Sequence, residues 1–132
     1  MKAVVCIVAV LSVIGCAASI GKGAQAQCHA RAAAPLDGEQ LFKSRCSGCH
    51  VMDEDGKGPR LRGVYGRRAG AVRWDGYSSG MRLASFAWDD YKLDKWLTDP
   101  DSVVNVSNME FKVRKKEERE AIIGFLKSDA AR

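Results

Sequence analysis

Two thiols and an imidazole stand together in the run Cys46-Ser47-Gly48-Cys49-His50. Two cysteines separated by two residues can each add across a vinyl group of haem, and the histidine that follows can bind the iron as its first axial ligand. This spacing is the signature of covalent c-type haem attachment. By itself it predicts a cofactor and not a function, because haem can carry electrons, activate peroxide or sense a gas.

Two other chemistries use closely spaced cysteines. A redox-active C-x-x-C opens a helix after a strand in a βαβ unit, whereas this motif follows a helical pattern. A structural zinc site needs two further ligands. The remaining cysteines are Cys6, Cys16 and Cys28, and the other histidine is His29, so the folded region offers no second closely spaced pair. We therefore predict haem attachment.

A second axial ligand has to come from elsewhere in the chain. A thioether favours ferrous iron and raises the reduction potential. Met1 leaves with any cleaved leader, and Met52 is too close to His50 to reach the opposite face of a haem. Met81 and Met109 remain, and either could instead fill the core. Spacing favours Met109 weakly, because it lies far along the chain after a helix and a proline-led loop.

Three helices are expected to position these groups, at residues 38–47, 90–98 and 117–128. The first begins after the N-cap residue Asp37 and delivers Cys46 and Cys49 to the haem edge. The second begins after Asp89 and is stopped by Pro100. The third has an inward apolar stripe and acidic residues in its first turn, which suit the helix dipole.

The rest of the chain has the composition of loops. Seven glycines interrupt residues 56–80, and no alternating strand pattern extends beyond a few residues. Three short helices and long loops make a poor apolar core, and a large apolar macrocycle would supply the missing centre. We therefore expect an all-α fold whose glycine-rich loops wrap around one covalent haem.

The first residues predict an export signal. Lys2 precedes an apolar run, and Ala24-Gln25-Ala26 is typical of a signal-peptidase site, so residues 1–26 are interpreted as a signal peptide. Two alternatives are a lipoprotein signal that ends at Cys16 and an uncleaved membrane anchor. We divide the chain after residue 26 into a flexible N-terminal tail at 27–36, a folded domain at 37–128 and a C-terminal tail at 129–132.

The charge of the chain indicates little about function. Its 132 residues include 21 basic and 16 acidic ones, for a net charge of +5. Basic residues cluster at 60–68 and 112–116, and acidic residues at 53–55 and 117–120. Such asymmetry could steer an acidic partner, and it fits an ordinary solvated surface equally well. Nucleic-acid binding is not expected, because no recognition motif accompanies the charge.

The order of motifs resembles that of the class I cytochromes c, of the mitochondrial and bacterial c2 type. The resemblance runs from Cys46-Ser47-Gly48-Cys49-His50 through Gly58-Pro59-Arg60-Leu61-Arg62-Gly63-Val64-Tyr65-Gly66-Arg67, Tyr77-Ser78, Trp88, Leu97-Thr98-Asp99-Pro100, Asn108-Met109-Glu110-Phe111 and Glu118-Arg119 to Phe125-Leu126. It covers nearly all of residues 37–128 and is more specific than C-x-x-C-H alone. It implies the small cytochrome c fold around one haem c.

The resemblance implies an axial ligand pair. Met109 matches the family's sulfur ligand opposite His50, and Pro59 matches the residue whose carbonyl accepts the ring N–H of that histidine. Trp96 stands where the family usually has an aromatic hydroxyl near the methionine ligand. An indole cannot reproduce a phenolic hydrogen bond in the same geometry.

The resemblance also implies residues around the haem edge. Arg67, Tyr77 and Trp88 match those near the buried haem propionate, whose carboxylate needs charge-assisted partners. Gly38 and Phe42 match the contact of the first helix with the last. A glycine there lets two helices approach closely.

The loop before Met109 departs most from the family pattern. That loop usually reads Pro-Gly-Thr-Lys, and here it reads Asn105-Val106-Ser107-Asn108. The change removes two rigid turn residues, which weakens the expectation of a stiff loop. Ser107 can still offer a hydroxyl to a propionate. Asn108 lacks the charge with which a lysine at this position often meets partners.

The resemblance implies an electron carrier and not an enzyme. We expect a monomeric periplasmic protein that moves electrons between respiratory or photosynthetic complexes over small transient interfaces. Its donor would be a quinol-oxidising complex or a dehydrogenase, and its acceptor an oxidase, a peroxidase or a photosynthetic centre. The N-terminus could tether it to a membrane. The alternative is a peroxidase-like or sensory haem protein with a labile Met109, although no distal His–Arg pair and no output domain can be identified.

Overall fold

Four α-helices and two 3-10 turns make up the regular structure of residues 34–132, the part of the chain that the computed structural model describes. The elements are α1 (Gly38–Arg45), α2 (Ser79–Leu83), α3 (Asp90–Thr98), η1 (Pro100–Ser102), α4 (Lys116–Lys127) and η2 (Asp129–Ala131). The described residues contain no strand, and one isolated antiparallel bridge joins Arg68 to Ala87. The predicted all-α class with three main helices is therefore confirmed.

The predicted export signal lies outside the described residues. The same holds for its alternatives, the lipoprotein signal that ends at Cys16 and the uncleaved anchor, and for most of the tail at 27–36. Within residues 34–132, no helix is long and apolar enough to cross a membrane.

Two aspartates start the helices that were predicted from their caps. The Asp37 carboxylate accepts from the backbone N–H groups of Glu39 and Gln40 at 3.0 and 3.1 Å, and Asp89 caps α3 through the N–H of Lys92 at 2.7 Å. These bonds satisfy N–H groups that have no partner inside a helix. Helix α1 ends at Arg45, two residues earlier than predicted, because the chain then turns through the C-x-x-C-H motif.

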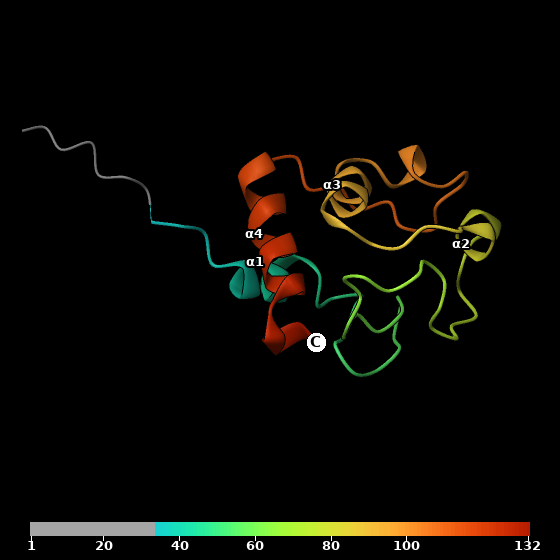
Figure 1. Ribbon diagram of the computed structural model, residues 1–132, viewed down its shortest axis with the longest axis horizontal. Coiled ribbons are helices and arrows are strands. Elements are labelled where there is room, and N and C mark those ends of the chain that lie inside the picture. Colours follow the sequence, from blue (N-terminus) through green and yellow to red (C-terminus); the bar gives the residue numbers. More distant parts are fainter. Residues whose placement is uncertain (1–33) are drawn as a thin grey trace, which may run out of the picture. The chain divides into compact units, whose positions relative to one another are not determined.

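Helices α1 and α4 cross at one end of the domain (Figure 1). The backbone of Gly38 packs so closely on α4 that a Cβ atom there would lie 2.0 Å from the carbonyl oxygen of Ala121. One turn later, the rings of Phe42 and Phe125 meet with centroids 5.4 Å apart. Ile122 is 1% exposed beneath this crossing. The contact fixes the start of the chain segment that carries the two cysteines.

The short helix α2 was not predicted. Its cap is Ser78, whose hydroxyl accepts from the backbone N–H of Met81 at 3.2 Å. Five residues are too few for a helical period to appear in a sequence pattern. The helix nevertheless buries Met81, which is 5% exposed in the core.

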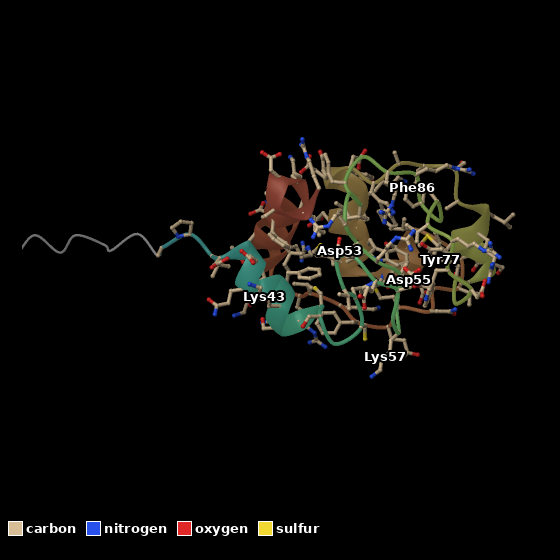
Figure 2. All side chains as sticks on the ribbon, turned by 90° about the horizontal axis from the view of Figure 1, so that it is seen from below. Lys43, Asp53, Asp55, Lys57, Tyr77 and Phe86 are labelled. Atoms are coloured by element: carbon tan, nitrogen blue, oxygen red, sulfur yellow. The ribbon has the colours of Figure 1, made fainter. Side chains whose placement is uncertain are left out.

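The last four residues, at 129–132, pack on the domain. The backbone N–H of Gly63 donates to the carbonyl of Ala131 at 2.7 Å, and Arg62 donates to the carbonyls of Ala130 and Arg132 at 3.1 Å each. Arg62 also pairs with Asp53, which lies on the loop after the C-x-x-C-H motif (Figure 2). One arginine therefore joins that loop to the C-terminal turn.

Candidate functional site

A cavity of about 420 Å³ lies among the helices and the glycine-rich loops. Its volume falls in the range of small-molecule and cofactor sites. Every residue that the resemblance assigned to haem or iron lines this cavity. Both methionines that the residue pattern left open, Met81 and Met109, line it as well. The sequence thus identified the members of one site, although they come from segments distributed over 64 residues.

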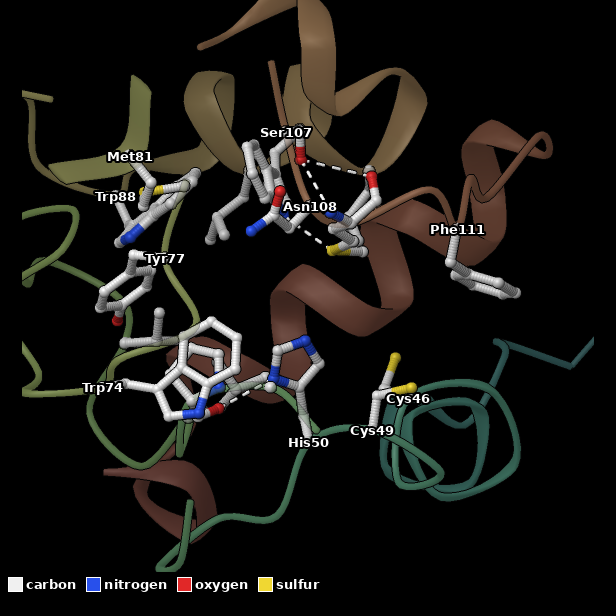
Figure 3. Close-up of a pocket in the computed structure, with 18 of the residues that line it drawn as sticks. Cys46, Cys49, His50, Trp74, Tyr77, Met81, Trp88, Ser107, Asn108 and Phe111 are labelled. Atoms are coloured by element: carbon white, nitrogen blue, oxygen red, sulfur yellow. Dashed lines mark hydrogen bonds between the residues drawn. The ribbon is translucent and has the colours of Figure 1, made fainter. Parts of the chain in front are cut away.

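The two cysteines and His50 form one wall of the cavity (Figure 3). The backbone N–H groups of Cys49 and His50 both donate to the carbonyl of Cys46, at 3.0 and 2.8 Å, and this turn places the three side chains together. Burial raises the pKa of the Cys46 thiol to about 11. A redox-active C-x-x-C lowers the pKa of its attacking thiol, so this environment argues against the thioredoxin alternative.

His50 is oriented by a backbone carbonyl. Its Nδ1 lies 2.8 Å from the carbonyl oxygen of Pro59, which leaves Nε2 available to a metal. Burial lowers the pKa of His50, an effect that the Pro59 carbonyl partly opposes, and the neutral ring is the form that binds metals. A Cβ atom on Gly58 would lie 2.3 Å from the ring, so only glycine fits beside it.

Met109 is held by contacts from α3 and from its own loop. The indole N–H of Trp96 donates to the Met109 sulfur at 3.1 Å. A thioether sulfur has two lone pairs, so it can accept this hydrogen bond and still offer one pair to a metal. Trp96 therefore supplies a donor to the sulfur, although its geometry differs from that of a phenol. The backbone N–H of Met109 donates to the Ser107 hydroxyl at 3.0 Å.

The loop before Met109 is tied to its surroundings. The Ser107 N–H donates to the Asp101 carboxylate at 2.7 Å, and the Asn108 amide donates to the carbonyl of Gly76 at 2.8 Å. The Ser107 hydroxyl donates to the Met109 carbonyl at 3.3 Å and accepts from the Met109 N–H at 3.0 Å, as the dashed lines in Figure 3 show. A serine two residues away can close such a local turn without any cofactor.

Arg67 places a guanidinium beside the cavity without a carboxylate partner in the described part of the chain. It donates to the carbonyls of Arg62 and Arg60 at 2.7 and 3.1 Å. Burial lowers the pKa of Arg67 and raises that of Tyr77. Trp88, which is 7% exposed, lines the same cavity. A partly buried cation with only carbonyl partners suits an anionic group of a bound molecule.

Trp74 is a lining residue that the sequence reasoning missed. Its indole N–H donates to the carbonyl of Gly56 at 3.3 Å, and its ring meets Tyr77 edge-on with centroids 5.1 Å apart. A Cβ atom on Gly76 would lie 2.4 Å from the Trp74 ring, so the loop closes tightly around the indole. A large aromatic residue inside a glycine-rich loop was the signal that could have identified it.

These features fit a haem. Two thiols and an imidazole share one wall, thioether sulfurs reach the cavity from other segments, and the lining between them is mostly apolar. The unpaired Arg67 guanidinium offers a partner for a haem propionate, which is a carboxylate that would otherwise be buried without a counter-charge.

Comparisons with known proteins agree with this site. The family model described as Cytochrome c matches residues 36–129. The cytochrome c of Euglena viridis is 36% identical over 94 residues, covering 69% of this chain and 92% of that protein. The cytochrome c of Chlamydomonas reinhardtii is 34% identical, covering 71% and 88%. The solved structure of cytochrome cH from Methylobacterium extorquens matches with a TM-score of 0.62 and 33% identity, over 70% of this chain and 96% of that one.

Three findings identify the family. The family model matches nearly all of the folded part, several relatives are more than 30% identical, and a solved structure of the family has the same fold. The C-x-x-C-H motif stands where such proteins attach their haem, and its residues line a cavity that suits the cofactor. The chain therefore belongs to the cytochrome c family as a class I, single-haem electron carrier, with its c-type haem attached through Cys46 and Cys49.

Proposed function

We propose that the chain is an exported one-electron carrier whose iron is held between His50 and Met109. One observation carries the ligand assignment. His50 and Met109 line the same cavity. The hydrogen bond at Nδ1 leaves the Nε2 of His50 free, and the Met109 sulfur accepts from Trp96 with one lone pair and keeps the other. His50 is fixed through Nδ1 by Pro59, and the Met109 sulfur is aimed by Trp96.

Bound haem supplies the one-electron couple of its iron, and the residues of the chain set the conditions for it. The Pro59 carbonyl increases the donor strength of the His50 ring through the hydrogen bond to Nδ1. Trp96 and the Ser107 turn hold the Met109 side chain in place. The apolar lining excludes water and disfavours the more highly charged oxidised state, which raises the potential.

Three side chains would surround a haem propionate. Arg67 supplies the charge, Tyr77 a hydroxyl and Trp88 an indole N–H, and the three line the same cavity. The unpaired guanidinium supports this assignment. Charge-assisted hydrogen bonds from these groups would keep a buried propionate ionised.

A carrier fits the described residues better than a peroxidase. Peroxide activation needs an open iron position and a second acid–base side chain beside it. Within residues 34–132, His50 is the only histidine, and the proposed mechanism uses it as a ligand. Iron held by both His50 and Met109 would have no open position, and the chemistry it would supply is exchange of one electron.

The predicted signal peptide and the bacterial origin of one relative support the proposed compartment and the proposed partners. Haem attachment outside the cytosol agrees with the predicted signal at 1–26, and cytochrome cH, the structural relative, is a bacterial protein. We propose a periplasmic carrier that takes electrons from a quinol-oxidising complex or a dehydrogenase. It would deliver them to an oxidase, a peroxidase or a photosynthetic centre.

Redox titration of the exported holoprotein tests this function. A carrier should give a single wave with a one-electron slope of about 59 mV per tenfold ratio of oxidised to reduced protein. The mass of the same sample should equal that of the processed chain plus one haem, and it would locate the cut. A protein that turns over peroxide rapidly while it exchanges electrons slowly would contradict the carrier function.

Replacing Trp96 with phenylalanine should lower the midpoint potential by about 20–60 mV. The range is the upper limit for a hydrogen bond of about 0.5–1.5 kcal/mol that is lost completely on oxidation, converted at about 59 mV per 1.4 kcal/mol. The indole N–H places partial positive charge beside the ligand sulfur, which disfavours oxidised iron, and phenylalanine removes that charge while it keeps the ring. Protein-film voltammetry measures the shift. Trp96→Tyr restores a donor and should recover part of it, whereas an unchanged potential in Trp96→Phe would exclude the hydrogen bond as a determinant.

A further inference from the structure

A small recess of about 180 Å³ lies between α3 and η1, and within the described residues it shares no lining residue with the haem cavity. We call it the α3–η1 recess, and its lining residues are Tyr91, Lys92, Lys95, Ser102 and Val103. At about 30 Å³ for each water molecule, this volume corresponds to roughly six waters, so it suits a small ion and not a large cofactor. The proposed electron transfer uses none of these residues.

Two lysines bring positive charge to the recess. Lys92 and Lys95 are three residues apart on α3, so their side chains are neighbours on the surface of the helix. Both ammonium groups lie near the ring of Tyr91, with the Lys92 Nζ 6.0 Å and the Lys95 Nζ 5.8 Å from its centroid. Like charges at this spacing repel each other, and an aromatic ring at the surface is a weak partner for a cation. An anion between the two lysines would remove the repulsion.

The carboxylates around the recess are engaged elsewhere. Five aspartates stand on or beside α3 and η1, and each binds another group: Asp89, Asp90, Asp94, Asp99 and Asp101. Asp94, which precedes Lys95, pairs with Arg119 of α4 at 2.7 Å. Within residues 34–132, Lys92 and Lys95 are therefore left without an acidic partner.

We propose that the α3–η1 recess binds inorganic phosphate or a phosphate monoester, held by Lys92 and Lys95 beside Tyr91. Such a phosphate carries a charge of about −1.5 to −2 at pH 7, so one group balances both lysines, whereas a carboxylate would balance only one. Lysine binds phosphate as a point charge, which suits two flexible side chains on one helix. Tyr91 is 65% exposed, and its ring offers an apolar face to the carbon part of an ester. The Ser102 hydroxyl donates to the Asp99 carbonyl at 2.6 Å, so the two lysines supply the binding.

NMR titration of the isotope-labelled, reduced holoprotein with inorganic phosphate tests the proposal, with chloride added to hold the ionic strength constant. The backbone amide signals of residues 91–95 and 102–103 should shift and reach saturation. The double variant Lys92→Gln/Lys95→Gln should bind phosphate about tenfold more weakly, because it loses both charged donors. Lys92→Arg/Lys95→Arg keeps both charges and should retain binding.

Lys43→Gln/Lys116→Gln is the matched control, because it removes the same charge from two lysines that pair with Glu39 and Glu120. This variant should bind phosphate as the wild type does. Equal weakening in the two glutamine double variants, or shifts that grow without saturation, would overturn the proposal. Equal affinity for dimethyl phosphate would overturn it as well, because that diester carries the single charge of a lipid headgroup phosphate and cannot balance two lysines.

Phenyl phosphate distinguishes the two forms of the ligand. Tighter binding of phenyl phosphate than of inorganic phosphate would identify a monoester whose carbon part contacts Tyr91, and Tyr91→Ala should then remove the gain. Equal binding of the two would identify the free ion as the ligand. Either result supports the recess as a phosphate site, provided that the affinity depends on Lys92 and Lys95.

Discussion

Replacing Met109 with alanine is expected to lower the midpoint potential of the holoprotein by on the order of 200 mV. A thioether stabilises ferrous iron because it is a soft ligand, and alanine offers no ligand at all. Water or an added base would then take the vacated position and favour the oxidised state. The variant should also become able to bind small external ligands in both redox states. Spectroelectrochemical titration of wild type and variant in parallel measures the shift.

Met81→Ala is the control for this result, since both methionines line the cavity. Met81 is 5% exposed and packs in the core, so its truncation should lower the free energy of unfolding by about 2–5 kcal/mol. The potential should change far less than in Met109→Ala. If Met81→Ala instead causes the large fall in potential, Met81 is the ligand and the assignment of Met109 is wrong.

Gly38→Ala should destabilise the protein by about 3 kcal/mol, which is a large effect for a single methyl group. The added Cβ would lie 2.0 Å from the Ala121 carbonyl oxygen and 3.1 Å from the Phe125 Cβ atom. Helix backbone cannot yield as a flexible side chain would, so α1 and α4 have to separate and the ring contact between Phe42 and Phe125 loosens. Urea unfolding of the holoprotein measures the loss.

The control for Gly38 is Gly124→Ala on α4 of the same helix pair. A Cβ atom on Gly124 meets nothing within 4 Å, so alanine there should stabilise the protein by about 0.5–1 kcal/mol through helix propensity. The two substitutions are chemically identical and differ only in what the methyl group meets. Equal stability of Gly38→Ala and the wild type would mean that the close helix crossing does not exist.

Local signals made most of the helices predictable. Asp37 and Asp89 are acceptors that bind free N–H groups at a helix start, and the structure shows both bonds. Pro100 follows α3 at the expected position. Helix α2 could not be predicted, because five residues contain less than two turns of periodic pattern. The packed turn at Asp129–Ala131 depends on Arg62, which is distant in sequence.

The site was predictable for a different reason. C-x-x-C-H is a covalent pattern with a fixed spacing, and the order of the remaining motifs resembles one family, so the lining residues could be named before the structure. The contacts between loops could not. The hydrogen bond from Asn108 to Gly76 joins residues 32 positions apart, and neither stands in a periodic pattern. The donation from Trp96 to Met109 likewise depends on how α3 faces the ligand loop.

The far-red absorption spectrum of the oxidised, exported holoprotein tests the central claim most directly. Iron bound by His50 and Met109 should show the weak sulfur-to-iron charge-transfer band of low-spin ferric haem. That band should persist in Met81→Ala and disappear in Met109→Ala. A wild-type protein without the band, or a Met109→Ala variant that retains it, would contradict the proposed ligand pair.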